Sequence, residues 1–127
     1  MSLQPYTKHA APGWRPALSI NAKMGTFTIN KSARHLMGID AGDVVTLLWD
    51  NAKPEDWYIQ VGGCNAFICR NTNANKTSLI FNSADLARQL FRAIGYIYDF
   101  GKMPIGEETE IDGMRVFPII TSKIKHH

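Results

Sequence analysis

The chain is poor in the residues from which many redox and metal sites are built. Its 127 residues contain two cysteines. Cys64 and Cys69 are five residues apart, and on one strand this spacing places them on opposite faces, so neither a shared metal nor a local disulfide is expected. We therefore predict two reduced cysteines that pack as small apolar side chains.

Long apolar runs and targeting signals are also missing from the sequence. No apolar run reaches the roughly 18 residues that a membrane-spanning helix needs. Residues 1–5 read Met-Ser-Leu-Gln-Pro and lack the apolar segment of a secretory signal. We therefore expect a cytoplasmic protein without a membrane partner.

The sequence contains no pattern of a common catalytic site. It has no Gly-rich phosphate loop, no nucleophile elbow and no His and Cys set at metal-ligand spacing. His9 and His35 are isolated, and the terminal His126 and His127 carry no functional argument. The acidic cluster at 107–112 is typical of a charged strand edge that discourages unwanted pairing. The sequence therefore predicts a non-enzymatic protein that needs neither a metal nor a cofactor.

The composition is that of a globular domain with a mild basic excess. Apolar residues make up 45% of the chain and charged residues 20%, which is enough apolar material for a buried core. The net charge of +3 is spread along the chain, with +1 over residues 1–62 and +2 over residues 63–127. Such a charge permits nucleic acid as a partner without requiring it.

An internal repeat is the most informative feature of the sequence. Residues 26–37 and 78–91 each contain a short apolar strand, an Asn and a helix that carries Ala-Arg-polar-Leu followed by a large apolar residue. The second copy has two extra residues after the Asn. Repetition of this kind predicts two half-units that complete each other. We expect an extended N-terminal arm at 1–14 and one domain at 15–127, made of half-units 15–62 and 65–121.

Each half-unit is expected to run strand–strand–helix–strand–strand. Hydrophobic periodicity and turn residues place strands at 15–22, 26–29, 44–49 and 57–61, and again at 66–70, 77–81, 108–111 and 114–117. One helix should follow Asn30 and end at Gly38, and the other should follow Asn82 or Ser83 and end at Gly95. Asp-Gly at 112–113 predicts a type I′ hairpin, and 96–106 is predicted to be an insertion. The fold class is therefore α+β and mostly β.

Residues 25–43 resemble the signature of the AbrB/MazE swapped-hairpin family. They read Gly-Thr-Phe-Thr-Ile-Asn-Lys-Ser-Ala-Arg-His-Leu-Met-Gly-Ile-Asp-Ala-Gly-Asp, which reproduces the family's strand, helix, Gly-Ile step and Gly-Asp turn. The resemblance covers roughly residues 15–61, whereas the second half shares the element order and residues 87–91. Members of this family are mostly DNA-binding regulators and antitoxins that build one interlaced barrel from two chains. The resemblance implies that this chain builds both halves of a swapped-hairpin-like β-barrel as an intrachain pseudo-dimer.

The resemblance also implies nucleic-acid binding, with double-stranded DNA as the ligand and transcriptional regulation as the role. The turns at Lys23 and Lys76 are equivalent, as are the helix positions of Arg34 and Arg88, so a pseudo-two-fold axis would create one bipartite basic face. Alternatively these side chains are solvated or paired internally, and Asp85 is well placed to pair with Arg88. The candidate nucleic-acid contacts are Lys23, Lys31, Arg34, Arg70, Lys76 and Arg88.

Two departures from the family pattern bear on an alternative function. Thr26 stands where the family usually has Arg, and Asn30 stands where it usually has Pro. The loss of the Arg favours a protein-interaction or assembly module that kept the fold without DNA binding. Its partner-binding residues would be Tyr96, Tyr98 and Phe100, and the partner would be another protein or a second copy of the chain.

Overall fold

The described part of the chain contains ten strands and two α-helices. The computed structural model describes residues 15–64, 66–72 and 77–126, so the expected arm at 1–14 and Lys76 lie outside the described residues. In chain order the elements are β1 (Ala17–Asn21), β2 (Thr26–Ile29), α1 (Lys31–Met37), β3 (Val44–Trp49), β4 (Trp57–Val61), β5 (Phe67–Ile68), β6 (Arg70–Asn71), β7 (Leu79–Asn82), α2 (Ala84–Ile94), β8 (Phe100–Pro104), β9 (Thr109–Ile111), β10 (Met114–Ile119) and the 3-10 turn η2 (Thr121–Lys123).

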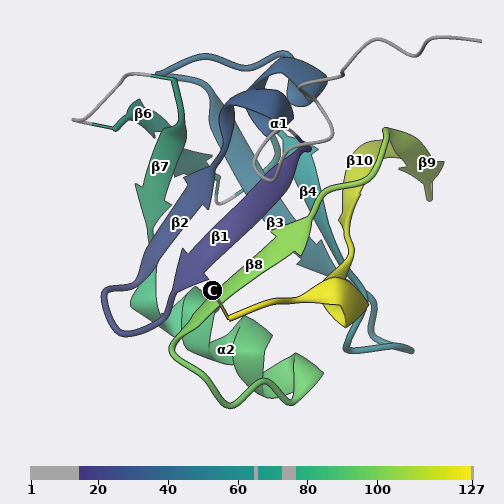
Figure 1. Cartoon of the computed structure of the whole chain (residues 1–127). Coiled ribbons are helices and arrows are strands. Elements are labelled where there is room, and N and C mark those ends of the chain that lie inside the picture. The colour runs from purple at the N-terminus through teal and green to yellow at the C-terminus, as the bar shows by residue number, and fades with distance from the viewer. Residues whose placement is uncertain (1–14, 65, 73–76, 127) are drawn as a thin grey trace, which may run out of the picture.

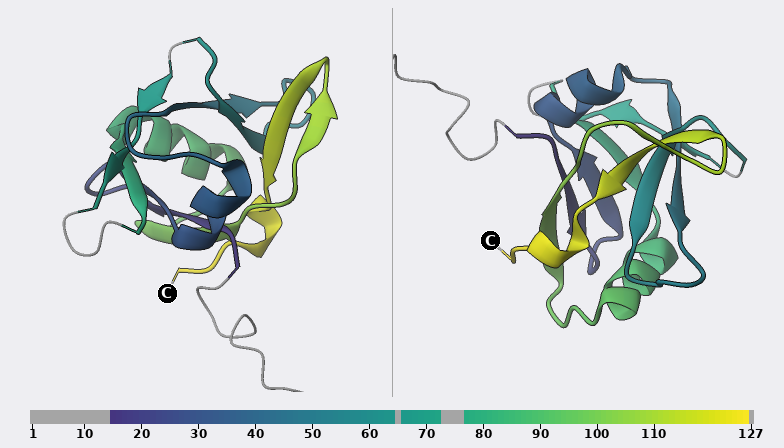
Figure 2. Two further views of the ribbon diagram at one scale, coloured as in Figure 1. Left: turned by 90° about the horizontal axis from the view of Figure 1, so that it is seen from above. Right: turned by 90° about the vertical axis from the view of Figure 1, so that its right-hand side faces the viewer.

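The strands form two five-stranded antiparallel sheets that face each other. We call β6-β7-β2-β1-β8 the front sheet and β5-β3-β4-β10-β9 the back sheet. Figure 1 looks onto the front sheet, and Figure 2 shows the two sheets from above and from the side, with α1 and α2 at opposite ends. This arrangement confirms the α+β, mostly β class.

One closed barrel was expected, but no closed barrel is found among the described strands. At one seam, β8 and β10 meet only at an isolated bridge between Ile105 and Ile119. Pro104 and Pro118 precede these residues, and a proline cannot donate a backbone N–H to a continuing ladder. The front and back sheets therefore remain separate.

The core lies between the two sheets because their strands alternate as the sequence predicts. Leu18 and Ile20 of β1 and Phe27 and Ile29 of β2 are buried, and in a strand such alternate residues share one face. Phe27 pairs with Phe81 of β7 across the strands, and their rings stack with centroids 4.7 Å apart. The apolar faces of the two sheets therefore meet in one core.

Every strand of residues 15–62 pairs with a strand from the second half of the chain. β1 pairs with β8, β2 with β7, β3 with β5, and β4 with β10. The two halves therefore share their ladders as well as their core.

Both helices begin and end where the sequence predicts. Asn30 caps α1 by accepting from the Ala33 N–H, and Ser83 caps α2 by accepting from the Leu86 N–H. Gly38 and Gly95 end the helices in the left-handed conformation. In the ranges that the structure describes, neither helix is long and apolar enough to cross a membrane.

Two predictions about the second half were wrong. The strand expected at 66–70 is two short strands, because Cys69 is hydrogen-bonded to Asp43 and Gly42 while β5 joins the back sheet and β6 joins the front sheet. The insertion expected at 96–106 contains β8, which pairs with β1 over five residues. Gly101 suggested a loop, but a Cβ there would lie 2.5 Å from the end of the Ile124 side chain, so a larger residue would require that side chain to move.

The hairpin prediction at 112–113 is confirmed. Asp112 and Gly113 have φ values of 53° and 78°, and positive φ at both central residues is the mark of a type I′ turn. The turn joins β9 to β10. Because β8 and β10 already supply the last two strands of the repeat, β9 is an additional strand of the second half.

Candidate nucleic-acid interface

A row of side chains that is basic at both ends, with two hydroxyls and one apolar residue between them, crosses the outer face of the front sheet. Ser19 lies between the buried Leu18 and Ile20, so its side chain points to the outer face. In register with Ser19 are residues of the four other strands, and we call this set the outer row: Arg70, Ile80, Thr28, Ser19 and Lys102. Strands in a sheet are about 4.8 Å apart, so Arg70 and Lys102 lie about 19 Å apart.

The outer row continues beyond the last strand of the sheet. Lys125 forms a two-way backbone pair with Lys102, with N···O distances of 2.7 and 2.9 Å. Residues directly opposite each other in an antiparallel pair have side chains on the same face. Lys125 therefore adds a second positive charge at this end of the row.

A second set of polar side chains flanks the outer row on the same face. Asn82, Thr26 and Asn21 are cross-strand neighbours. The Asn82 amide donates to Thr26 Oγ1 at 3.2 Å, and its Oδ1 accepts from the Arg70 guanidinium. Arg70, a predicted contact, is thus held in the plane of this face by Asn82. Amide and hydroxyl groups such as these contact phosphates in protein–DNA complexes.

The charge on the two sheets is unequal. The strands of the front sheet and the 22–25 turn contain no Asp or Glu, and Asp99, directly before β8, is the nearest acid to them in the chain. Nine of the eleven acidic residues lie at 40–56 and 107–112, around the strands of the back sheet. The basic excess is therefore concentrated on one face of the molecule.

Lys23 lies in the turn between β1 and β2 and is exposed. This turn sits beside α2, because the Gly25 carbonyl accepts from the Ser83 N–H at 2.8 Å. Lys23 is therefore at the α2 end of the front sheet. The equivalent turn of the second half contains Lys76, which lies outside the described residues.

Arg34 of α1 holds parts of both halves together. Its guanidinium donates to Asp40 Oδ1 at 2.9 Å, to Asn71 Oδ1 at 3.2 Å and to the Thr77 carbonyl at 3.5 Å. Its side chain is 19% exposed. These contacts join α1 to the segments that flank the β6–β7 turn. Lys31, one turn earlier, is exposed.

Arg88 of α2 is paired as the sequence suggested. It donates to Asp85 Oδ1 at 2.8 Å within the same helix, and both side chains are well exposed. Figure 1 shows α1 and α2 at opposite ends of the molecule, so the structure does not bring Arg34 and Arg88 to one site. The two helix arginines differ in environment although their positions in the repeat match.

The three aromatic candidates for partner binding have different environments. Tyr96 packs against Phe91 with centroids 4.8 Å apart and donates its hydroxyl to the Phe100 carbonyl at 2.6 Å. Burial, and to a lesser extent Tyr98, raises the pKa of Tyr96. Tyr98 is 50% exposed and stacks on His126, whereas Phe100 is opposite Asn21 on the outer face. Tyr98 and Phe100 are accessible, and Tyr96 is largely a packing residue.

Sequence reasoning missed Lys102 and Lys125. Both were in segments without an assigned strand, and only the strand register shows that they extend the row that begins at Arg70. The alternation of Lys102 with the buried Gly101 and Met103 was the available signal.

Among the described residues, no group of three or more His, Cys, Asp or Glu side chains is arranged to hold a metal ion. Cys64 is exposed and Cys69 is buried, and both are free thiols.

No protein-family model, curated protein or solved structure matches the chain.

Proposed function

We propose that this protein is a non-enzymatic nucleic-acid-binding protein whose contact surface is the outer face of the front sheet. The observation that carries the proposal is the outer row, which has a cation at each end and no acidic residue on the same strands. Nucleic-acid affinity depends mainly on Lys and Arg contacts to phosphates, and nearby carboxylates would oppose it.

The dimensions of the row suit a nucleic-acid backbone. One strand of a duplex carries one phosphate for about every 3.4 Å of helix axis, so a row about 19 Å long laid along that axis spans about five to six steps. The hydroxyl and amide groups between the cations would donate to phosphate oxygens. Double-stranded DNA is the ligand that the AbrB/MazE resemblance favours, with transcriptional regulation as the role.

The shared ladders support the same resemblance. We propose that the two half-units form an intrachain pseudo-dimer of swapped-hairpin type, because each strand of the first half pairs with one from the second. In the front sheet β2 is the central strand and pairs with its equivalent β7, and the 22–25 turn lies at the α2 end of the sheet. Lys23 would then flank the outer row, and Lys76 lies outside the described residues.

The test is fluorescence anisotropy with mixed-sequence duplex DNA at about 50 and about 200 mM salt. We expect Lys23→Gln/Lys102→Gln to weaken binding and to reduce the salt slope by about 2, since each lost phosphate contact removes about 0.9. Arg115→Gln on the β9–β10 hairpin is the control, because Arg115 is exposed on the other sheet. Arg34→Ala/Arg88→Ala should change the salt slope less, because both side chains already have acidic partners.

A second function competes with this one. Ile97 is 87% exposed beside Tyr98, and exposed apolar side chains of this kind favour a protein-interaction or assembly module. No binding to duplex DNA at 50 mM salt would refute the first proposal and favour this alternative. Equal weakening by Arg115→Gln and by the double variant would refute the assignment of the binding face.

A further inference from the structure

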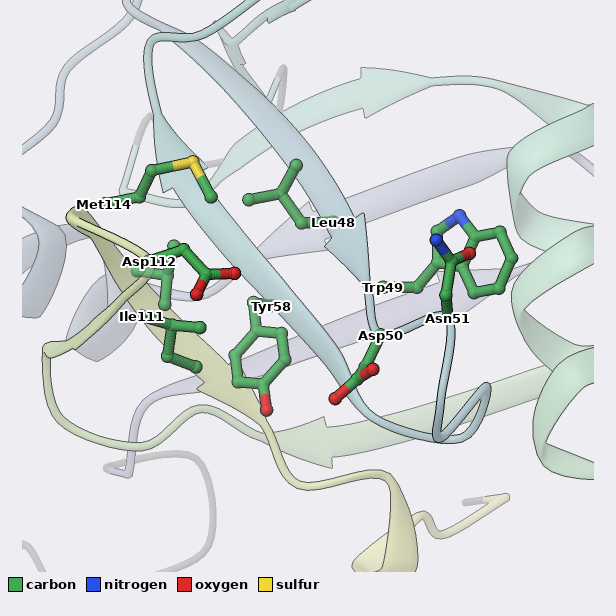
Figure 3. Close-up of a pocket in the computed structure, with 9 residues that line it drawn as sticks. Leu48, Trp49, Asp50, Asn51, Tyr58, Ile111, Asp112 and Met114 are labelled. Carbon is green, nitrogen blue, oxygen red and sulfur yellow. The ribbon is translucent and has the colours of Figure 1, made fainter.

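A groove of about 300 Å³ opens between the outer face of the back sheet and the β9–β10 hairpin. Leu48 and Tyr58 form its floor, where they are cross-strand partners on β3 and β4. Ile111 and Met114 come from the hairpin, and Val116 is buried beneath it. Figure 3 shows the side chains of Leu48, Ile111 and Met114 around that of Tyr58.

The groove exists because β10 divides its pairing between two neighbours. Phe117–Ile119 pair with β4, whereas Met114–Val116 pair with β9. The hairpin therefore extends beyond the part of the back sheet formed by β3 and β4, and it forms a wall beside that part. β9 has no counterpart in the first half, so this wall is a departure from the repeat.

Hydrogen bonds fix both segments that border the groove, the 50–56 loop and the β9–β10 hairpin. The 50–56 loop is closed by a bond of 3.1 Å from the Asp50 N–H to the Asp56 carbonyl and by one of 2.9 Å from Trp57 Nε1 to the Pro54 carbonyl. The hairpin is held by its type I′ turn and by three register pairs with β10. A preformed groove of this kind costs little conformational entropy to fill.

The rim of the groove is strongly negative. Asp50 and Asp112 line it, one from the 50–56 loop and one from the hairpin turn, and Figure 3 shows them on either side of Tyr58. Segments 50–56 and 107–112 together contain seven acidic residues and one lysine. Burial, followed by the carboxylates of Asp56 and Asp50, raises the pKa of the Tyr58 phenol. Charge complementarity therefore calls for a cationic occupant.

The apolar surface around the groove calls for more than a cation. Met114 is 37% exposed although it is a large apolar side chain, and it lines the groove together with Leu48 and Ile111. An ammonium or guanidinium group lying over the Tyr58 ring could pair with Asp50 and Asp112, and its apolar neighbours would cover Leu48, Ile111 and Met114. Nucleic acid would be repelled here, so the expected ligand is a polypeptide.

We propose that this groove docks an extended segment of a partner protein in which an arginine or lysine is flanked by apolar residues. The groove is lined by residues of the back sheet and its hairpin, whereas the proposed nucleic-acid face belongs to the front sheet, and Figure 2 shows the two sheets on opposite sides of the molecule. Both surfaces can therefore be occupied at the same time. The docking site draws its floor from the first half of the chain and one wall from the second.

The test is an NMR titration of the ¹⁵N-labelled full chain with an acetylated and amidated nonapeptide of alternating Leu and Arg. We expect shifts confined to residues 48–51, 58 and 111–116. The same peptide with citrulline in place of arginine keeps the shape without the charge, and it should bind at least about ten-fold more weakly. Duplex DNA should leave these residues unshifted.

Two variants that each remove two negative charges distinguish binding in the groove from a nonspecific effect of the acidic surface. Asp50→Asn/Asp112→Asn should weaken peptide binding at least about ten-fold and leave DNA affinity unchanged. Asparagine retains the Oδ1 that accepts from the Ala52 N–H and suits the first position of a type I′ turn. Glu55→Gln/Glu107→Gln removes two charges outside the groove lining and should bind the peptide like the wild type.

Four outcomes would overturn the proposal. These are equal affinity for the citrulline peptide, equal weakening by both double variants, no shifts at millimolar peptide, and butylguanidinium binding as tightly as the peptide. The last outcome would make the groove a site for a small cation instead of a protein segment.

Discussion

Gly25 is the residue at which the two halves approach most closely in the β1–β2 turn. Its φ is +69°, and a Cβ there would lie 2.8 Å from the backbone N and Cα of Ala84 at the start of α2. We predict that Gly25→Ala lowers the free energy of unfolding by at least about 2 kcal/mol, because the strain of positive φ adds to a clash with backbone atoms. Urea denaturation measures this loss as a lower midpoint with an unchanged m-value.

Gly42→Ala is the matched control for Gly25→Ala. Gly42 also has a positive φ, of +97°, but open space surrounds the position of its Cβ. Only the conformational strain remains there, which amounts to about 1 to 2 kcal/mol. Equal losses in the two variants would show that close packing at Gly25 contributes nothing.

The two cysteines should differ in reactivity. Burial and the nearby Asp43 raise the pKa of the Cys69 thiol to about 11, whereas Cys64 is exposed. We predict that at pH 8 a thiol-specific reagent labels one thiol, Cys64, in the folded chain and both in urea. Peptide mass mapping identifies the labelled residue. Labelling of Cys69 in the folded protein at the rate of Cys64 would contradict its burial.

The same pKa shift predicts the direction of a pH effect on stability. The folded pKa of Cys69 lies above the usual value of 9.0. Between about pH 9 and pH 11 the unfolded chain loses the Cys69 proton whereas the folded chain keeps it. Because the folded state then binds more protons, the free energy of unfolding decreases as the pH rises through that range. Cys69→Ala should reduce this part of the alkaline decline in the urea midpoint.

At the level of single residues, sequence patterns predicted the side-chain directions that depend only on spacing along the chain. The inward direction of Leu18, Ile20, Phe27 and Ile29 follows from alternation alone. The environment of Arg34 could not be predicted, because its partners Asn71 and Thr77 are 37 and 43 residues away in the chain.

At the scale of elements, the N-cap residues of the two helices should contribute unequally to the stability of the fold. Asn30 Oδ1 accepts from the Ala33 N–H at 2.9 Å and from the Ala17 N–H at 3.0 Å, and its Nδ2 donates to the Arg15 carbonyl at 2.7 Å. Asn30→Ala therefore removes the cap of α1 and the attachment of β1, which should cost about 2 to 3 kcal/mol.

Ser83→Ala is the comparison for Asn30→Ala. The Ser83 hydroxyl makes one cap bond, of 3.3 Å to the Leu86 N–H, so its loss should cost about 1 kcal/mol. Thermal and urea unfolding of both variants measure the difference. Asn30→Asp keeps the acceptor oxygen and loses the Nδ2 donor, so its loss of stability should be smaller than that of Asn30→Ala. A larger loss for Ser83→Ala would refute this assignment of the caps.

Element by element, the sequence predicted helices and turns better than short strands. Caps and left-handed glycines are local signals, and they placed α1, α2 and the 112–113 turn correctly. The sequence did not predict β8 because Gly101 and Pro104 are typical of loops. Its partner β1 also lies about 80 residues earlier in the chain, so no local pattern indicates the pairing. A two-residue strand such as β5 or β6 has no periodicity to detect.

At the scale of the whole molecule, the repeat predicted that the halves complete each other but not how the sheets divide. The seam at Ile105 and Ile119 depends on two prolines that meet from distant strands. The outer row likewise requires the register of five strands, and one of its cations lies in a strand that sequence patterns did not reveal. Composition alone gave a mildly basic chain without locating its basic face.

The sharing of strands leads to a prediction about folding. We expect residues 15–62 alone to be unfolded or dimeric, because β1, β2, β3 and β4 would each lose a partner from the second half. Phe27 would also lose its stacking partner Phe81. A segment this short rarely builds an independent core, so a folded state requires a second copy to replace the missing strands.

Far-UV circular dichroism and sedimentation equilibrium of residues 15–62 measure this outcome. A dimer would show strand signal that grows with concentration, whereas an unfolded segment would show none. Addition of residues 63–127 should restore native-like signal at equimolar ratio, since the second half supplies the missing partners. A stable, folded monomer of residues 15–62 would contradict the pseudo-dimer, because the ladders between the halves would then be unnecessary for folding.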